Sequence, residues 1–193
     1  MQPNVYSIMI RLIIEKGSPE NGELWIGLLD DFNMGIRWTR HIQEQSTILK
    51  TSGNNEWEIR ILQEAQNKIT EDAIKWGNVE TGGVLIGRIF LNRRSITIAR
   101  VFDAPVDSKR SAFSFVLGTK DLKKEITKIF EKSGGVLTYV GTWHSHPYGA
   151  GEASGTDRDS YAKIKALRLG APSVFLIWTP SRLNAIVDEG KIS

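Results

Sequence analysis

The chain has 193 residues, 40% of them hydrophobic, with six Trp and seven Phe, which is enough for one domain of ordinary size or one domain with an appendage. Its net charge is +3 and its basic residues occur as short pairs, so we expect no nucleic-acid partner. No run reaches the roughly 18 apolar residues that a membrane span requires, and the N-terminus does not resemble a secretory signal. The absence of cysteine excludes disulfides and cysteine-bound metal, and it suits a cytoplasmic protein.

The first fifty residues predict a small β unit. Residues 5–14 alternate between apolar and polar side chains, and residues 24–28 and 36–38 continue the same period with turn residues between them. This unit carries no chemistry that we can identify. His41, in a polar stretch with no partner at ligand spacing, is expected to be a surface residue.

A boundary is predicted at residues 51–55, Thr-Ser-Gly-Asn-Asn. Apolar residues then recur at steps of three and four over residues 62–76, which predicts an amphipathic helix that Gly77 ends. We therefore expect residues 1–53 to be an N-terminal β extension, or the tail of an upstream domain in a longer polypeptide. Residues 54–193 would form the second domain.

Strands and helices alternate through this second domain. Extended segments are predicted at 84–86, 95–101, 112–117, 136–143, 174–178 and 183–187, and helices at 122–130, with Thr119 as its cap, and at 161–167. Such interleaving predicts an α/β or α+β layered domain in which helices cover a sheet.

Metal-ligand chemistry is concentrated after residue 143. If residues 136–143 form a strand, His144 and His146 leave its end on one face, while Ser145 points to the other face. Asp157 follows eleven residues after the second histidine. Two imidazoles and one carboxylate suit zinc, and three protein ligands with a vacant fourth position are typical of a catalytic site.

The intervening loop is rich in glycine, since Gly149, Gly151 and Gly155 allow it to fold back toward the histidines. Ser154 and Asp157 also fit a capping box ahead of the predicted helix at 161–167. The two interpretations are compatible, because an aspartate at a helix start can still face a metal. A histidine pair on its own is often structural, so the metal hypothesis depends on the conjunction of all these residues.

The same residues resemble the signature of the JAMM (MPN-plus) metalloprotease family. That pattern consists of His-x-His-Pro, then Ser-x-x-Asp, with a glutamate upstream of a glycine-rich strand. Every position of the pattern is present here: Glu80 before residues 81–87, His144, His146, Pro147, Ser154 and Asp157. The resemblance extends over roughly residues 56–187 and does not include the first fifty.

The resemblance implies a curved mixed β-sheet covered by helices, related to the cytidine-deaminase fold, with the metal at one sheet edge. It implies that His144, His146 and Asp157 bind Zn²⁺. Glu80 would be the general base that takes a proton from the attacking water. Ser154 would donate a hydrogen bond to the developing oxyanion.

Enzymes of this family cut the amide bond after the C-terminal glycine of ubiquitin-like proteins. The expected partners are therefore a ubiquitin-like protein or its conjugates, with ubiquitin-activating-like and ubiquitin-conjugating-like proteins beside it, as in bacterial antiphage conjugation systems. Three alternatives stay open: a peptidase that trims a sulfur-carrier precursor, a non-catalytic MPN scaffold for protein contacts, and a RadC-like DNA-associated protein, which the weak basic character disfavours.

Overall fold

The structure is a computed structural model of the full chain. It describes residues 8–13, 23–30, 35–41, 45–51, 56–149 and 171–189. The chain divides into two compact units, Met1–Glu44 and Gln45–Ser193.

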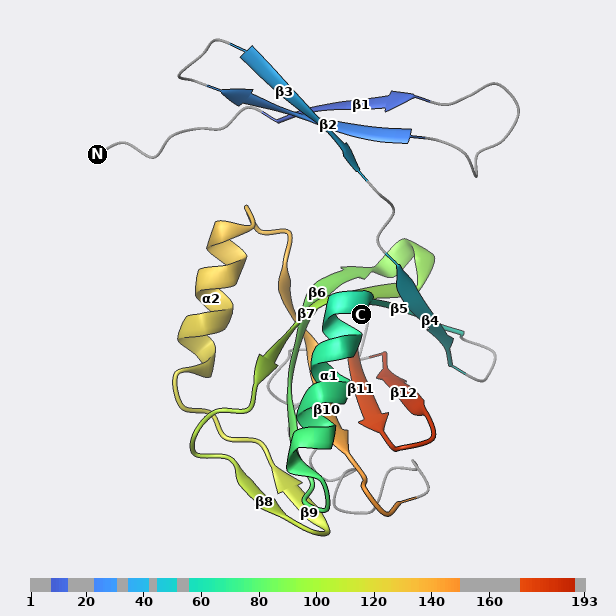
Figure 1. The fold of residues 1–193 in the computed structure, drawn as a ribbon, viewed down its shortest axis with the longest axis vertical. Helices are drawn as coiled ribbons and strands as arrows, with labels where there is room; N and C mark the ends of the chain where they lie inside the picture. The colour runs from blue at the N-terminus through green and yellow to red at the C-terminus, as the bar shows by residue number, and fades with distance from the viewer. Residues whose placement is uncertain are drawn as a thin grey trace. The chain divides into compact units, whose positions relative to one another are not determined.

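The first unit contains a three-stranded antiparallel sheet in the order β1-β2-β3 (Figure 1). Its strands are β1 (Ile8–Ile13), β2 (Glu23–Asp30) and β3 (Gly35–His41). They lie where the alternating sequence pattern predicts them. That this unit is an N-terminal β extension, or the tail of an upstream domain, stays a prediction.

The second unit is built on a seven-stranded sheet in the order β12-β11-β10-β6-β7-β5-β4. Its strands are β4 (Ser46–Lys50), β5 (Glu58–Leu62), β6 (Gly82–Phe90), β7 (Ser95–Asp103), β10 (Thr138–Ser145), β11 (Ser173–Trp178) and β12 (Leu183–Asp188). The pairs β10/β11 and β5/β7 are parallel and the other neighbours are antiparallel. The predicted mixed sheet is confirmed.

This sheet curves until its two edges approach one another. Strand β12 contacts β4 although the two stand at opposite ends of the strand order. Next to that contact, the Trp57 indole Nε1 donates a hydrogen bond to Glu189 Oε1 at 3.3 Å, and Arg94 Nη1 lies 3.4 Å from the same oxygen. The curvature gives the sheet a concave face that one helix can fill.

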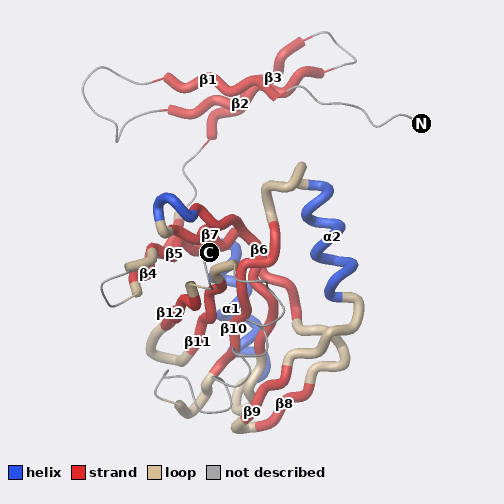
Figure 2. The backbone as a smooth tube through the Cα atoms, turned by 180° about the vertical axis from the view of Figure 1, so that it is seen from behind, coloured by secondary structure: helices blue, strands red, loops and turns tan. Residues whose placement is uncertain are grey.

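That helix is α1 (Gln63–Trp76), which the sequence predicted at 62–76. Ala65, Ile69 and Ala73 form its core stripe, and each is at most 1% exposed. Gly77 ends the helix with a φ of 55°, and its N–H donates to the Ala73 carbonyl at 3.1 Å. A glycine adopts this left-handed backbone at little cost. Figure 2, from behind, shows the sheet strands in front of α1.

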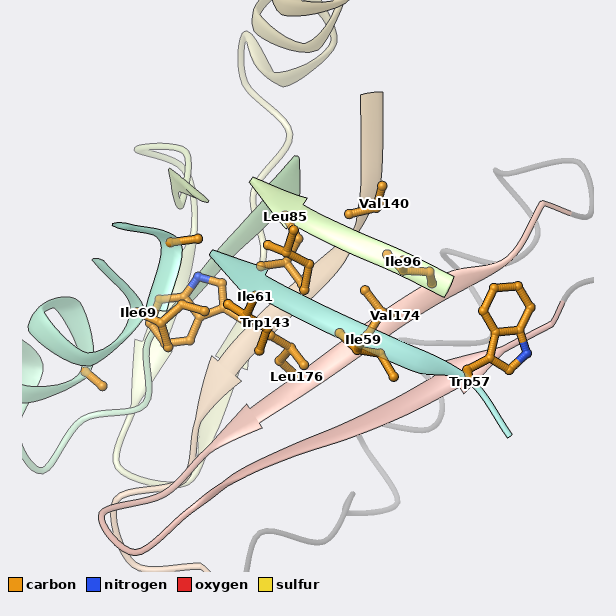
Figure 3. Close-up of a cluster of buried hydrophobic side chains, with 13 residues drawn as sticks. Trp57, Ile59, Ile61, Ile69, Leu85, Ile96, Val140, Trp143, Val174 and Leu176 are labelled. Atoms are coloured by element: carbon orange, nitrogen blue, oxygen red, sulfur yellow. The ribbon is translucent and has the colours of Figure 1, made fainter. Parts of the chain in front are cut away.

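The main hydrophobic core lies between α1 and the sheet (Figure 3). It contains Trp57, Ile59, Ile61, Ile69, Leu85, Ile96, Val140, Trp143, Val174 and Leu176. The alternate positions of β6 and β11 are buried as well: Val84, Ile86, Phe175 and Ile177. Because successive strand residues point to opposite faces, the sheet is covered on both sides at these central strands.

A second helix, α2 (Leu122–Lys132), lies beside β10. It has the predicted amphipathic pattern, yet none of its residues is buried. The predicted cap was wrong, since Asp121 is the N-cap residue and no side chain caps the helix. Thr119 instead accepts a hydrogen bond from the Leu122 N–H through its backbone carbonyl, at 3.2 Å.

Two further strands form a small hairpin, β8 (Lys109–Ser111) paired with β9 (Ser114–Val116). The sequence predicted one extended segment at 112–117, because the tight turn between these strands has no glycine or proline. A short 3-10 helix, η2 (Leu91–Arg93), joins β6 to β7.

Strands β4 and β5 escaped the sequence analysis. β4 pairs along its whole length with β5, from Ser46 opposite Leu62 to Lys50 opposite Glu58. It therefore belongs to the second unit, and the division of the chain lies after Glu44 rather than at the expected 53/54. The helix predicted at 161–167 lies outside the described residues. Over the part of the chain that is described, no helix is long and apolar enough to cross a membrane.

Candidate active site

The two clustered histidines are held at the end of β10, between β6 and β11. His144 pairs with Gly82 on one side and Ile177 on the other. The His146 N–H donates to the Trp178 carbonyl at 2.8 Å. The side chains are only 7% and 8% exposed. Because neighbouring strands fix both backbones, the imidazoles have little freedom to move relative to one another.

The two imidazoles converge on one point. His144 Nε2 and His146 Nε2 lie 2.9 Å apart, and the ring centroids are separated by 4.7 Å. One ring can donate a hydrogen bond to the other at this distance. Two nitrogen ligands of one tetrahedral zinc, each at about 2.0–2.1 Å, would lie about 3.3 Å apart, so a small adjustment lets both bind a single ion.

The histidine side chains face away from α1. Trp143 belongs to the core on the α1 side, and alternation then puts His144 on the opposite face. Between the histidines, the Ser145 hydroxyl accepts a hydrogen bond from the Thr81 N–H at 3.0 Å, and the Ser145 N–H donates to the Thr81 carbonyl at 2.7 Å. Ser145 thus joins β10 to the segment before β6 and is not a ligand candidate.

The pairing of β10 with β6 places Glu80 close to the two histidines. His144 stands opposite Gly82 in the antiparallel pair β10/β6. Continuing that register by two residues brings Glu80 opposite His146, on the same face as both imidazoles. Glu80 is partly buried. The arrangement brings a carboxylate, the predicted general base, to the same end of the β6/β10 pair as the two predicted ligands.

The β8–β9 hairpin packs against the same segment. The Glu80 N–H donates to the Ser111 carbonyl at 2.8 Å. The Phe115 ring lies over Gly82, where an added Cβ would come within 2.5 Å of Cε1 and 2.8 Å of Cδ1. Only glycine allows this close approach. The hairpin therefore forms one wall beside Glu80.

A second glycine supports the His146 ring. Gly149 donates its N–H to the His146 carbonyl at 3.4 Å. A Cβ at Gly149 would lie 2.9 Å from His146 Cβ and 3.1 Å from Nδ1. The backbone of residue 149 thus packs directly against the imidazole, and a side chain there would push the ring.

Three of the five predicted site residues lie together where β10 ends and β6 begins: Glu80, His144 and His146. Ser154 and Asp157 lie outside the described residues. Among the residues that the structure does describe, no three His, Cys, Asp or Glu side chains form a metal-binding group. The two converging nitrogens nevertheless fit two ligands of one ion, and they leave room in its shell for further ligands.

The aromatic residues beside the ligands have different environments. Trp143 is a core residue, 1% exposed, whereas Tyr148 is 63% exposed. Sequence analysis gave neither Thr81 nor Phe115 an individual role in the site. The available signal was the Thr-Gly-Gly run after Glu80, since a glycine pair at the start of a buried strand indicates close approach by another segment.

The curved mixed sheet and the two described helices are features expected of a JAMM (MPN-plus) domain, and the histidine pair lies at the end of the inner strand β10. A family model described as prokaryotic homologs of the JAB domain matches residues 62–186, well over half of the chain. The chain therefore belongs to the prokaryotic JAB-domain family, which confirms the resemblance drawn from the motif.

Two curated relatives are similar over part of the chain. The chain is 35% identical over 89 residues to "Probable metalloprotease y4qB" from Sinorhizobium fredii, with 46% of this chain and 54% of the relative covered. It is 34% identical over 99 residues to "CD-NTase/cGAS isopeptidase" from Enterobacter hormaechei, with 51% of this chain and 53% of the relative covered. The matches thus span about half the length of these relatives.

Among solved structures, the chain is similar to protein DSY2949 from Desulfitobacterium hafniense, determined in solution. The sequences are 21% identical and the TM-score is 0.41, with 67% of this chain and 82% of that chain covered.

Proposed function

We propose that this chain is a zinc-dependent isopeptidase or peptidase that hydrolyses the amide bond after the C-terminal glycine of a ubiquitin-like protein. The observation that carries the proposal is the convergence of His144 Nε2 and His146 Nε2, 2.9 Å apart. They lie at the end of β10 where the pairing with β6 places Glu80 on the same face. The curated names of the relatives, a metalloprotease and an isopeptidase, support the same chemistry.

In this mechanism His144, His146 and Asp157 would hold the ion, and the ion would supply the Lewis acidity that lowers the pKa of a water to about 7. The Glu80 carboxylate accepts the proton of the attacking water and later delivers it to the leaving amine. Ser154 donates a hydrogen bond to the carbonyl oxygen as negative charge develops there. The nearly complete burial of both histidines limits competing water and strengthens these interactions.

The substrate class is part of the proposal, and the family and the isopeptidase name of one relative support it. In this proposal the glycine-ended tail places its last carbonyl near Glu80. The name of the Enterobacter relative, an isopeptidase, supports deconjugation. The proposal further places this deconjugation in a bacterial antiphage system, with ubiquitin-activating-like and ubiquitin-conjugating-like proteins as partners. Trimming of a C-terminally extended precursor uses the same chemistry and is distinguished by substrate.

The test compares two substrates of a ubiquitin-like protein that ends in glycine: a linear C-terminal fusion and a lysine-branched conjugate. Wild type should cleave at least one of them after the terminal glycine. Glu80→Gln keeps the shape of the side chain but cannot accept the proton, so cleavage should fall by at least about 10²-fold while the melting temperature and metal content stay the same.

The matched variant His146→Ala should lose metal and activity together. Failure of metal-loaded wild type to cleave either substrate would contradict the proposal and favour a non-catalytic MPN scaffold. Full activity of Glu80→Gln would contradict the assigned base while leaving hydrolysis in place.

A further inference from the structure

Arg110 joins three elements beside the site. It lies on β8, and its Nε donates a hydrogen bond to Thr81 Oγ1 at 3.2 Å. Its guanidinium carbon lies 4.4 Å from the ring centroid of Trp76, the last residue of α1, and 5.6 Å from that of Phe115 on β9. We call these four residues, Arg110, Thr81, Trp76 and Phe115, the Arg110 cluster.

Thr81 connects the Arg110 cluster to the predicted site residues. It follows Glu80 directly and is 1% exposed. Its N–H and carbonyl are bonded to Ser145, the residue between the two histidines. Its hydroxyl accepts from Arg110. One buried residue therefore connects the histidine strand, the Glu80 segment and the hairpin.

Glu80 is held on the hairpin side as well. Its N–H donates to the carbonyl of Ser111, the neighbour of Arg110. Phe115, under the Arg110 guanidinium, packs on Gly82 two residues after Glu80. Any displacement of the hairpin would therefore shift the backbone on both sides of the Glu80 side chain.

We infer that Arg110 is a positioning residue for the hydrolysis proposed above: it fixes the hairpin on Thr81 and so holds the Glu80 carboxylate in its working geometry. The inference rests on that proposed function. Arginine suits this role because its planar fork donates a hydrogen bond while its face stacks on aromatic rings. Lysine keeps the charge but loses the Nε donor and the planar face.

The consequence is a rate effect with little effect on stability. Trp76 is 41% exposed and Arg110 is only partly buried, so the Arg110–Trp76 part of the cluster is peripheral to the core. A catalytic group displaced by about 1 Å costs on the order of 10²-fold in rate. Arg110→Ala should therefore lower kcat by about 10-fold to 10²-fold, with KM changed less than about twofold and with metal content and melting temperature near wild type.

Three variants sharpen the test. Thr81→Val removes the acceptor and should reproduce the loss in kcat. The kcat of Arg110→Lys should be closer to that of Arg110→Ala than to that of the wild type. Lys109→Ala, an exposed basic neighbour on the same strand, is the matched control and should leave both kinetic constants unchanged.

The decisive measurement is a double-mutant cycle on the cleavable substrate. If Arg110 acts through Glu80, Arg110→Ala should cost less than about twofold in kcat once Glu80 is already glutamine, since coupled residues are not additive. An equal loss in both backgrounds, a rise in KM with unchanged kcat, or no loss at all would overturn the inference. Each of those results requires an active wild type, so it is distinct from failure of the proposed function.

Discussion

Two helices with the same sequence pattern have different environments in this protein. In α1 the apolar stripe Ala65, Ile69 and Ala73 is at most 1% exposed. In α2 no residue is buried, Ile129 is only partly covered, and Phe130 is 47% exposed. A period of 3.6 residues therefore shows that a helix has an apolar face, and leaves open whether the fold covers that face.

Each helix nevertheless leads into one of the strands that carry the site. α1 ends at Gly77 and the chain then passes Glu80 into β6, while α2 is followed by Gly134 and Gly135 before β10 delivers His144. Both site strands lie next to each other in the sheet. The placement of the site residues therefore depends on strand pairing and on the α1 core, and much less on the packing of α2.

The largest expected effect is a loss of unfolding free energy when an apolar side chain of α1 is truncated, compared with the same truncation in α2. Ile69→Ala removes a fully buried side chain and should cost about 2–5 kcal/mol of unfolding free energy. Ile129→Ala should cost under about 1 kcal/mol, because part of its surface is already exposed and alanine is the better helix former. Denaturant unfolding of the two variants measures this, and equal losses would remove the difference between the helices.

The next effect concerns β4, which helps to cover α1. Leu49 packs on the core, and the Thr47 hydroxyl is hydrogen-bonded to Gln66 of α1. A chain starting at Gln45 should melt at the same temperature as the second unit does within the full chain. A chain starting at Asn54 lacks β4 and should melt about 5 °C lower or more. Both should still fold and bind metal. Aggregation of the longer chain would show that the first unit is part of the same core.

Alanine substitutions at two glycines, one beside His146 and one after α2, should have different effects. Gly149→Ala would press a methyl group on His146 and should lower cleavage by about tenfold or more, a displacement effect. Gly134, after α2, has a φ of 62° and open space around its Cα, so Gly134→Ala should cost about 1 kcal/mol of stability with unchanged activity. Parallel kinetic and melting measurements would contradict this if both variants lost only stability.

The smallest effect is a pH dependence at the side of α1. Lys68 Nζ lies 2.8 Å from Asp103 and 3.0 Å from Asp72. The hydrogen bond from Lys68 lowers the pKa of Asp103, so its contribution exists above the unfolded pKa and is lost as the pH falls through the folded value. Burial raises the pKa of Asp72, and its contribution has the opposite sign: it is present below the unfolded pKa and lost as the pH rises.

Asp103→Asn should therefore flatten the loss of stability on acidification below about pH 4, the ordinary range of an aspartate. Asp72→Asn should act above about pH 4 instead, where it removes the stability that the wild type gains on acidification from the raised pKa of Asp72. Because the Asp103 side chain is 72% exposed, both changes should shrink at high salt. Unfolding curves over pH, at two salt concentrations, would refute this assignment if the two variants changed in the same direction.

Sequence reasoning went furthest where residue type and spacing carry the physics. Five of the seven strands of the large sheet, among them the strand that carries His144, and both described helices were predicted from periodicity and glycine positions. The edge strand β4 was missed because Ser46 to Lys50 has no clear alternation and gains its order by pairing with β5. The Arg110 cluster was missed because contacts between α1, the residue before β6 and the β8–β9 hairpin depend on tertiary packing, which no local pattern encodes.

The central claim is that His144 and His146 share one metal ion, and elemental analysis of protein purified without chelator tests it most directly. We expect one zinc per chain in the wild type, and none in His144→Ala or His146→Ala. The matched control is His41→Ala, which changes the third histidine, on β3 of the other unit, and should retain the full zinc content. A wild-type protein that holds no metal and takes none up when zinc is added would contradict the account.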